Sequence, residues 1–208
     1  MLHNLRNDGP KKTFDPTCKR DIDTTFGYDY FDGSRERGYG GYTYDGRWKE
    51  VCKRVVERYK LKAPAKVLDI GCAKGFFCYD MMQLYPGIEA YGIETSQYAI
   101  SQAPESIRKY IIYADQMKMP FESHQFDFIL SVNTLHWVTP DRVKPALQEM
   151  MRVGKNNFFL QVDAYHNEEE KRRLLAWAPT VSTLFSVEQW LKLFDEVGYK
   201  SDYYWTII

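Results

Sequence analysis

Apolar runs and helical stripes alternate along most of the chain. Short, near-continuous apolar runs bounded by turn residues predict buried strands, and apolar positions three or four residues apart predict helices. The predicted strands are 66–70, 89–93, 110–113, 126–132 and 157–162, with a closing strand at 202–208. The predicted helices are 47–59, a segment from the loop at 71–75 through Leu84, then 96–103, 140–153, 167–177 and 186–197. This alternation predicts an α/β fold built on a parallel, doubly wound sheet.

The chain before residue 47 lacks this alternation. Residues 1–20 are polar and aperiodic, so we expect an arm without regular structure. Residues 26–48 interleave Tyr, Phe and Trp with glycines without a period of 2 or 3.6, which predicts a loop that lies on the core or over a cleft. We therefore assign residues 1–46 to an N-terminal arm and Tyr/Gly-rich cover, and residues 47–208 to the main domain.

Composition excludes several classes of partner. The 28 Lys and Arg balance the 28 Asp and Glu, so the chain has no excess positive charge to attract nucleic acid or an anionic membrane. The N-terminus is polar and no apolar stretch approaches the roughly 20 residues of a membrane span, so we expect a cytoplasmic protein. The four cysteines lack the spacing of metal ligands, so we expect free thiols and no metal.

A loop of small residues follows the first predicted strand. Gly71-Cys72-Ala73-Lys74-Gly75 comes directly after it, and an acid, Glu94, follows the second strand. Small residues let the backbone amides at a helix N-terminus approach an anionic group. Dinucleotide-binding loops share this arrangement but need their third glycine three residues after the second. Here the small residues alternate, and the bulky Phe76 follows them where it would crowd a pyrophosphate.

The segment 67–76, VLDIGCAKGF, resembles the first motif of class I S-adenosylmethionine-dependent methyltransferases, with Ala73 at the middle glycine. The resemblance covers about residues 67 to 162 and implies a Rossmann-like fold, S-adenosyl-L-methionine as cofactor and S-adenosyl-L-homocysteine as product. Members usually close the sheet with an antiparallel strand pair, whereas one clear strand ends this chain. We therefore expect a mostly parallel sheet of six or seven strands with helices on both faces.

The resemblance also implies cofactor contacts, residue by residue. Asp69 would hold the ammonium group, Glu94 the ribose hydroxyls and Asp115 the adenine amine, while Asn133 would lie beside the sulfonium. Glu94 and Asp115 also have structural interpretations, as a helix cap and a turn residue. The cofactor-binding set is Asp69, Gly71, Ala73, Gly75, Glu94, Thr95, Asp115, Gln116, Asn133, Tyr42 and Tyr44.

Candidate residues for the acceptor follow the fourth and fifth strands. Methyl transfer is an in-line displacement, and a base helps when the acceptor is a hydroxyl. His136 is the candidate catalytic base or acceptor-orienting group, because it titrates near neutral pH; a structural hydrogen bond beside Trp137 is the alternative. The expected substrate set is Arg47, Asp163, Tyr165 and His166.

The sequence says less about the methyl acceptor than about the cofactor. Residues 39–48 and 202–205 resemble small bacterial methyltransferases of polysaccharide or secondary-metabolite pathways, which implies a small polar acceptor, such as a sugar or nucleotide-sugar, methylated on oxygen or nitrogen. The alternatives are a protein or other macromolecular acceptor and a non-catalytic cofactor-binding module. After the fourth strand, residues 133–136 lack the Asn/Asp-Pro-Pro-aromatic signature of base methyltransferases, so we do not expect a nucleic-acid acceptor.

Overall fold

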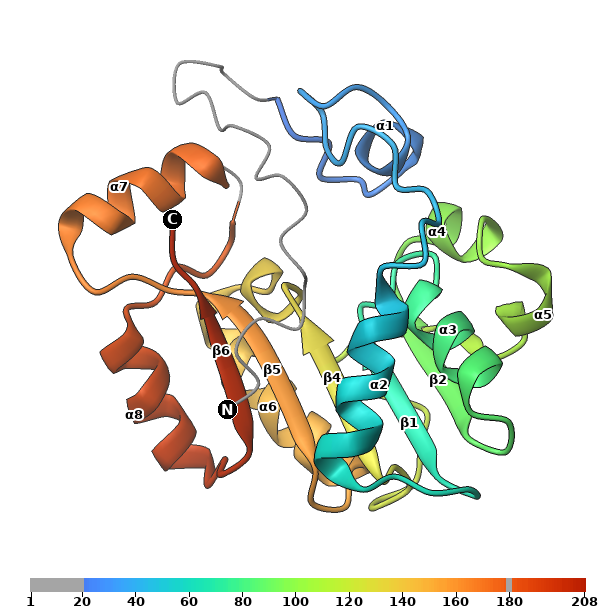
Figure 1. The fold of residues 1–208 in the computed structure, drawn as a ribbon. Helices are drawn as coiled ribbons and strands as arrows, with labels where there is room; N and C mark the ends of the chain where they lie inside the picture. The colour runs from blue at the N-terminus through green and yellow to red at the C-terminus, as the bar shows by residue number, and fades with distance from the viewer. Residues whose placement is uncertain (1–20, 179–180) are drawn as a thin grey trace.

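The computed structural model describes residues 21–178 and 181–208, so the expected arm at 1–20 lies outside the described residues. A sheet of six strands in the order β3-β2-β1-β4-β5-β6 forms the centre of the molecule (Figure 1). Every neighbouring pair of strands is parallel. The predicted α/β, doubly wound fold is therefore confirmed, with six strands and with no antiparallel pair in the part of the chain that the structure describes.

The elements follow the predicted order. The strands are β1 (Lys66–Ile70), β2 (Glu89–Glu94), β3 (Ile111–Tyr113), β4 (Phe128–Val132), β5 (Phe158–Asp163) and β6 (Asp202–Thr206). The helices are α1 (Tyr28–Phe31), α2 (Trp48–Tyr59), α3 (Phe76–Leu84), α4 (Gln97–Ser101), α5 (Glu105–Arg108), the 3-10 turn η1 (Leu135–Trp137), α6 (Pro140–Val153), α7 (Glu168–Trp177) and α8 (Val187–Val197). Sequence patterns did not predict α1, α5 and η1. The helix expected at 96–103 ends early as α4, and Pro104 then begins α5, because proline lacks the N–H that would continue a helix.

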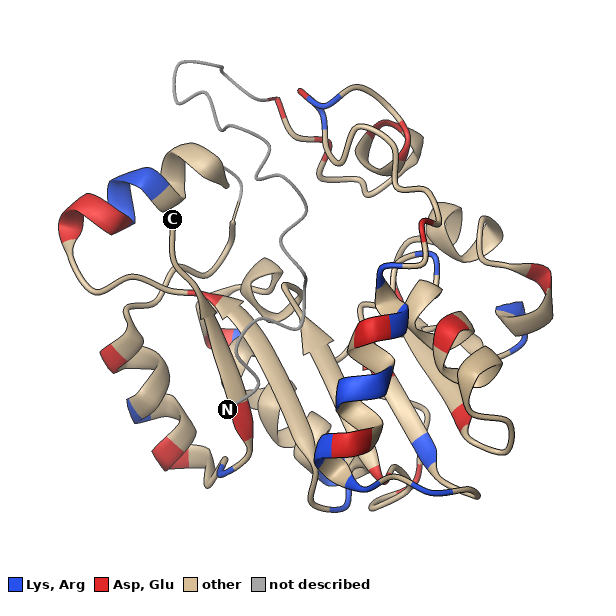
Figure 2. Ribbon diagram, in the orientation of Figure 1, with Lys and Arg blue, Asp and Glu red and all other residues tan. Residues whose placement is uncertain are grey.

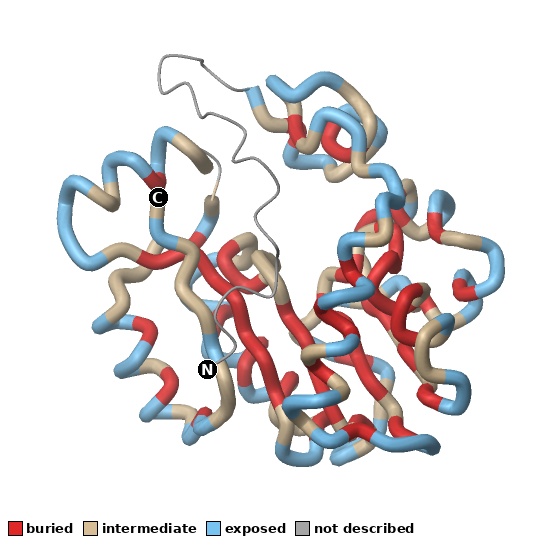
Figure 3. Tube along the Cα trace, viewed as in Figure 1, coloured by how far each residue is buried: buried red, intermediate tan, exposed pale blue. Residues whose placement is uncertain are grey.

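Each face of the sheet carries its own apolar layer. α2 covers one face, where Val55 belongs to the same cluster as Phe128 of β4. α6 and α8 cover the other face, where Leu147 and Trp190 join Leu160 of β5. All five side chains are fully buried, and Figure 3 shows the central strands as the most buried part of the chain. Burial on both faces explains why these strands read as continuous apolar runs.

The outer surface is mixed in charge. Figure 2 shows acidic and basic residues side by side on α2, α7 and α8. Within residues 21–178 and 181–208, none of the helices is long and apolar enough to cross a membrane. Cys52, Cys72 and Cys78 are free and buried, which agrees with the expectation of free thiols, and Cys18 lies outside the described residues.

The order of the strands reverses between β1 and β4. β1 pairs with β2 on one side and with β4 on the other, and later strands extend outward from each. At such a point the two adjacent strands lead into connections that run to opposite faces of the sheet, which leaves a crevice at their carboxyl ends. In Figure 1 this end of the sheet points toward α1.

A buried ion pair ties the N-terminal cover to the loop after β1. Lys74 Nζ lies 2.7 and 2.6 Å from the two carboxylate oxygens of Asp32, the residue after α1. The Tyr98 hydroxyl donates to the same carboxylate at 2.6 Å, and the Tyr42 backbone N–H donates to it at 3.2 Å. The side chains of Lys74 and Asp32 are only 7% and 19% exposed. Because buried charges are costly unless they are paired, this cluster constrains the position of the cover.

The ion pair predicts a pH-dependent stability. Burial raises the pKa of Asp32, but hydrogen bonds from Lys74 and Tyr98 outweigh burial and hold this pKa below its usual value. A carboxylate with a lowered pKa stabilises the fold above its unfolded-state pKa, and this contribution is lost as the pH falls through the folded-state pKa. We expect Asp32→Asn to lower the free energy of unfolding by about 1–3 kcal/mol near neutral pH. The difference from the wild type should shrink below about pH 4.

Urea unfolding of both proteins, at neutral pH and at about pH 3, measures this effect. Asp45→Asn is the control, because Asp45 pairs with Arg47 at a solvent-exposed position and its removal should cost under about 1 kcal/mol. A difference between Asp32→Asn and the wild type that is the same at both pH values would contradict the prediction.

Candidate functional site

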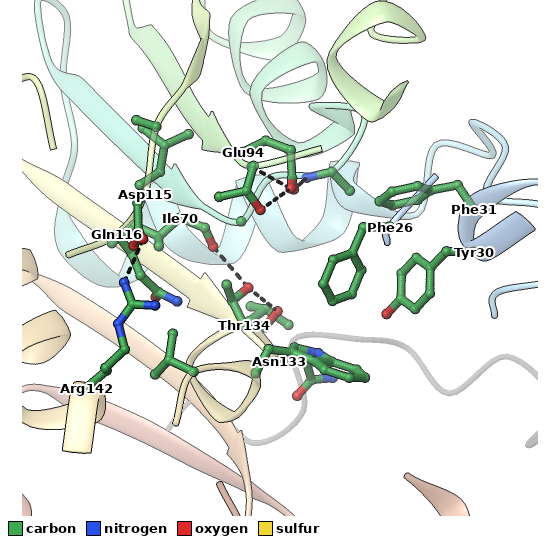
Figure 4. Close-up of a pocket in the computed structure, with 18 of the residues that line it drawn as sticks. Phe26, Tyr30, Phe31, Ile70, Glu94, Asp115, Gln116, Asn133, Thr134 and Arg142 are labelled. Atoms are coloured by element: carbon green, nitrogen blue, oxygen red, sulfur yellow. Dashed lines mark hydrogen bonds and ion pairs between the residues drawn. The ribbon is translucent and has the colours of Figure 1, made fainter. Parts of the chain in front are cut away.

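A cavity of about 240 Å³ lies at the carboxyl ends of the central strands. Its wall combines the loops after β1, β2, β3 and β4 with aromatic residues of the cover, and Figure 4 shows several of these side chains around it. The expected cofactor-binding residues that line it are Gly71, Ala73, Glu94, Thr95, Asp115, Gln116 and Asn133. The tertiary structure thus brings residues from four separate loops into one cavity.

The loop after β1 requires a glycine at position 71. Gly71 has a φ of +71°, and a Cβ at this position would lie 2.4 Å from side-chain atoms of Thr134. The Thr134 hydroxyl donates to the carbonyl of Ile70 at 3.1 Å, so the loops after β1 and β4 are in direct contact. Ala73 also has a positive φ, 51°, which costs about 1–2 kcal/mol for a residue with a Cβ. The backbone of this loop is therefore held in a specific, strained conformation.

Glu94 connects the loops after β1 and β2. Its Oε2 accepts a hydrogen bond from the Ala73 N–H at 2.9 Å, and its Oε1 accepts from the N–H groups of Thr95 and Ser96 at 2.7 and 2.9 Å. A carboxylate has about four lone-pair positions, so Oε2 keeps the capacity to accept from a ligand hydroxyl. Glu94 therefore has a structural role and also presents a carboxylate to the cavity.

Asp115 also has two partners within the protein. Its Oδ1 accepts from the Met117 N–H at 2.9 Å, as expected of a turn residue, and its Oδ2 lies 2.7 Å from Nη2 of Arg142 (Figure 4). The side chains of Arg142 and Asp115 are 44% and 49% exposed, so solvent and ligands can reach the pair. Sequence patterns did not point to Arg142. Its position in the first turn of α6, the helix after β4, is the signal that could have found it.

Asp69 and Gly75, which were expected to bind the cofactor, do not line the cavity. Gly75 is the N-cap of α3 with a φ of 71°. The carboxyl group of Asp69 is buried. Burial, with a smaller contribution from the charge of Glu94, raises the pKa of Asp69 to about 8. A nearby cation would favour the ionised form of this carboxyl.

Aromatic residues of the cover close one side of the cavity. The ring of Phe26 meets Trp137 of η1 edge-on at 5.4 Å between centroids, and Tyr30 meets Trp137 at 6.3 Å. The Ser96 hydroxyl donates to the carbonyl of Phe26 at 2.6 Å, which attaches the start of the cover to α4. Both interpretations of the Tyr/Gly-rich segment apply, since its rings pack against one another and also line the cavity.

Tyr42 and Tyr44, which the sequence placed in the cofactor-binding set, do not line this cavity. The Tyr44 hydroxyl donates to Oδ1 of Asp80 on α3 at 2.6 Å. The Tyr42 ring stacks on Phe76 at 5.2 Å, so both tyrosines pack against α3. The physical reason is the Asp32 cluster, which fixes the earlier part of the cover over the cavity. The cover residues that line it are Phe26, Tyr30, Phe31 and Tyr39.

A second cavity of about 300 Å³ adjoins the first. Asn133 and Trp137 contribute to both cavities, as do two tyrosines of the cover. The remaining wall of the second cavity includes His136, Asp163, Arg35, Arg47, Tyr42 and Trp177. Asn133 therefore lies at the junction, and its φ of 54° is an uncommon conformation that often marks a functional residue.

His136 and Asp163 form a buried pair in the second cavity. They are 3% and 0% exposed. Nδ1 of His136 lies 3.6 Å from Oδ2 of Asp163 and accepts a hydrogen bond from the backbone N–H of the same residue at 3.4 Å. Burial lowers the pKa of His136 and the charge of Asp163 partly opposes this, while burial raises the pKa of Asp163. The imidazole is therefore biased toward its neutral form, which can accept a proton.

Tyr165 and His166 line neither cavity, so the structure does not bring them together with the other expected substrate residues. Tyr165 forms a backbone bridge to Ser186, just before α8. The side chain of His166 is 56% exposed and its Nδ1 lies 3.1 Å from Glu170 of α7. The chain after β5 leads into α7, and this path carries both residues away from the carboxyl end of β5. Asp163 and Arg47 are the expected substrate residues that reach the second cavity.

Comparisons with known proteins agree with this geometry. A family model described as "Methyltransferase domain" matches residues 68–160. The chain is 31% identical over 136 residues to the malonyl-[acyl-carrier protein] O-methyltransferase of Legionella pneumophila, covering 62% of this chain and 47% of that protein. It is 27% identical over 133 residues to the tRNA (carboxymethyluridine(34)-5-O)-methyltransferase of Arabidopsis thaliana, covering 63% of this chain and 31% of that protein.

A solved structure has the same fold. A putative S-adenosyl-L-methionine-dependent methyltransferase of Methanococcus maripaludis aligns with a TM-score of 0.54 and 17% identity over 74% of this chain and 77% of that one. The chain spans less than half the length of the two curated relatives above. The matched residues 68–160 nonetheless contain the loop after β1, Glu94, Asp115 and Asn133. Residues 68–160 belong to the methyltransferase-domain family, and the fold of the chain is that of class I S-adenosylmethionine-dependent methyltransferases.

Proposed function

We propose that this protein transfers a methyl group from S-adenosyl-L-methionine to a small polar acceptor bound in the second cavity. One observation carries the proposal: two adjoining cavities meet at Asn133, one lined by acidic acceptors and the other by a buried His–Asp pair. Holding two reactants in a productive orientation is the main requirement of an in-line displacement. A junction between two cavities supplies that arrangement.

The first cavity fits the cofactor of the family. The Glu94 carboxylate suits a pair of ribose hydroxyls, and Asp115 suits the adenine amine. The buried carboxyl of Asp69, near the end of β1 but outside the lining of this cavity, is the candidate partner for the cofactor's ammonium group, directly or through water, and that cation would favour its ionised form. When bound, S-adenosyl-L-methionine supplies a methyl group activated by a sulfonium, and S-adenosyl-L-homocysteine is the product.

His136 is the general base of the proposed reaction. Its neutral imidazole would accept the proton of an acceptor hydroxyl as the new bond to carbon forms. Asp163 then stabilises the imidazolium that results. Because both groups are buried, their interaction is stronger than it would be in water.

The walls of the second cavity favour a small acceptor that has polar groups. Tyr39 and Trp137 offer aromatic faces, while Arg47 and His136 offer polar groups. Aromatic faces with hydrogen-bonding groups at their edges suit a sugar or nucleotide-sugar, methylated on oxygen or nitrogen. A second candidate is an acceptor group presented by a carrier protein, because the name of the Legionella relative gives malonyl-[acyl-carrier protein] as its acceptor.

Methyl-labelled cofactor tests the proposal directly. The purified protein is incubated with labelled S-adenosyl-L-methionine and, in separate reactions, with sugars, nucleotide-sugars, malonyl-loaded acyl-carrier protein and tRNA. We expect the label in a small-molecule fraction, and calorimetric titration should show binding of S-adenosyl-L-methionine and S-adenosyl-L-homocysteine. Label only in the carrier protein would favour the second candidate. Binding of NAD alone, or a bound cofactor that transfers no label to any fraction, would refute the proposal.

Glu94→Gln should weaken the binding of S-adenosyl-L-homocysteine by about 10- to 100-fold, because a hydrogen bond to a charged group contributes about 1.5–3 kcal/mol. Isothermal titration calorimetry measures the change. Glu89→Gln is the matched control, since Glu89 lies at the opposite end of β2 and pairs with Lys66. Equal affinities in the two variants would exclude the proposed contact of Glu94 with the ribose.

His136→Asn should lower kcat by about 100-fold, within the range typical of a lost general base. Since burial lowers the pKa of His136, the wild-type base stays neutral throughout the neutral range, and kcat should fall only in acid, below about pH 6.5. This acid decline should be absent from the variant. His166→Asn, at an exposed position outside both cavities, should match the wild type. Full turnover of His136→Asn at every pH would end the proposed role as base.

A further inference from the structure

Thr206, at the end of β6, connects Gln161 of β5 to Asn133, which lies at the junction of the cavities. Its hydroxyl accepts a hydrogen bond from Nε2 of Gln161 at 3.0 Å and donates to Oδ1 of Asn133 at 3.4 Å. The Asn133 backbone N–H donates to the carbonyl of Gln161 at 2.9 Å. Asn133 is thus held through its backbone by β5 and through its side chain by β6.

This contact determines which end of the Asn133 amide faces the junction. A side-chain amide has an acceptor oxygen at one end and a nitrogen with two N–H donors at the other. Because Oδ1 accepts from Thr206, Nδ2 must point away from Thr206. Asn133 lines both cavities, so Nδ2 is the end available to a ligand there.

Thr206 is also close to the buried His136–Asp163 pair. The register between β5 and β6 places Thr206 directly opposite Asp163. The Ala164 N–H donates to the carbonyl of Thr206 at 3.1 Å, which extends the pairing by one residue. Thr206 therefore contacts Asn133 and also lies next to Asp163, the partner of the proposed base.

We propose that Thr206 is a positioning residue, whose hydroxyl fixes the Asn133 amide so that Nδ2 donates a hydrogen bond to the acceptor at the junction of the cavities. This inference rests on the proposed methyl transfer. A correctly oriented donor contributes to kcat, since small errors in orientation are costly in a displacement reaction. If the Thr206 hydroxyl only accepted the hydrogen bond from Gln161, its removal would lower stability without changing the orientation of Asn133.

Two substitutions of Thr206 and one control distinguish the positioning role from a purely stabilising role. Thr206→Val keeps the shape but removes the donor and acceptor, whereas Thr206→Ser keeps the hydroxyl. We expect Thr206→Val to lower kcat about tenfold, as for the loss of one hydrogen bond, with the KM for S-adenosyl-L-methionine within about twofold of the wild type. Thr206→Ser should recover most of the loss. Tyr203→Phe, which removes a hydroxyl from a 42% exposed side chain on the same strand, should change neither constant.

The kcat measurement uses whichever of the acceptors tested above takes the label. A second measurement, by NMR, needs no acceptor. In ¹⁵N-labelled protein bound to S-adenosyl-L-homocysteine, the side-chain amide resonances of Asn133 should shift in Thr206→Val and return in Thr206→Ser. A kcat of Thr206→Val within about twofold of the wild type, or no recovery with serine, would overturn the inference. If the wild type transfers no label at all, the proposed function fails separately. The amide resonances then decide, and unchanged resonances in Thr206→Val would overturn the positioning role.

Discussion

The reversal of strand order between β1 and β4 is the constraint on which the rest of this structure depends. It opens the crevice at the carboxyl ends of the strands, and the loops after β1 and β4 touch each other beside this crevice. The contact needs a glycine at position 71, because a side chain there would collide with Thr134. The cavity expected to hold the cofactor exists because the backbone can approach this closely.

The N-terminal cover closes one side of the cavity at the carboxyl ends of the strands. An open crevice exposes its ligand to water, and a sheltered site strengthens the electrostatic interactions within it. The Asp32–Lys74 ion pair links the cover to the loop after β1, so the same loop shapes the cavity and attaches its aromatic side. With the cover in place, a second cavity forms between the cover and the end of β5, where burial lowers the pKa of His136 beside Asp163. A neutral imidazole at that position is what a base for an acceptor hydroxyl requires.

Several residues of the site have structural and functional roles together. Glu94 accepts from three backbone N–H groups and still faces the cavity, and Asp115 closes a turn while it pairs with Arg142. An acid that bonds to the protein backbone and also faces the cavity is held in place before a ligand binds, which makes the site rigid. The double role also means that a substitution at either acid acts on the loops as well as on binding, so matched controls are needed to separate the two effects.

The sequence by itself determined the order of strands and helices, the parallel sheet and the loop at 71–75, because these follow from local periodicity and from small residues at fixed spacing. It also indicated Glu94, Asp115 and His136, which lie in the connections after predicted strands. Only the tertiary structure decided which tyrosines of the cover line the cavity, that Arg142 pairs with Asp115, and that Tyr165 and His166 turn away. The contact between Asn133 and Thr206 joins residues 73 positions apart. Such contacts depend on how distant segments pack, and no local pattern encodes that packing.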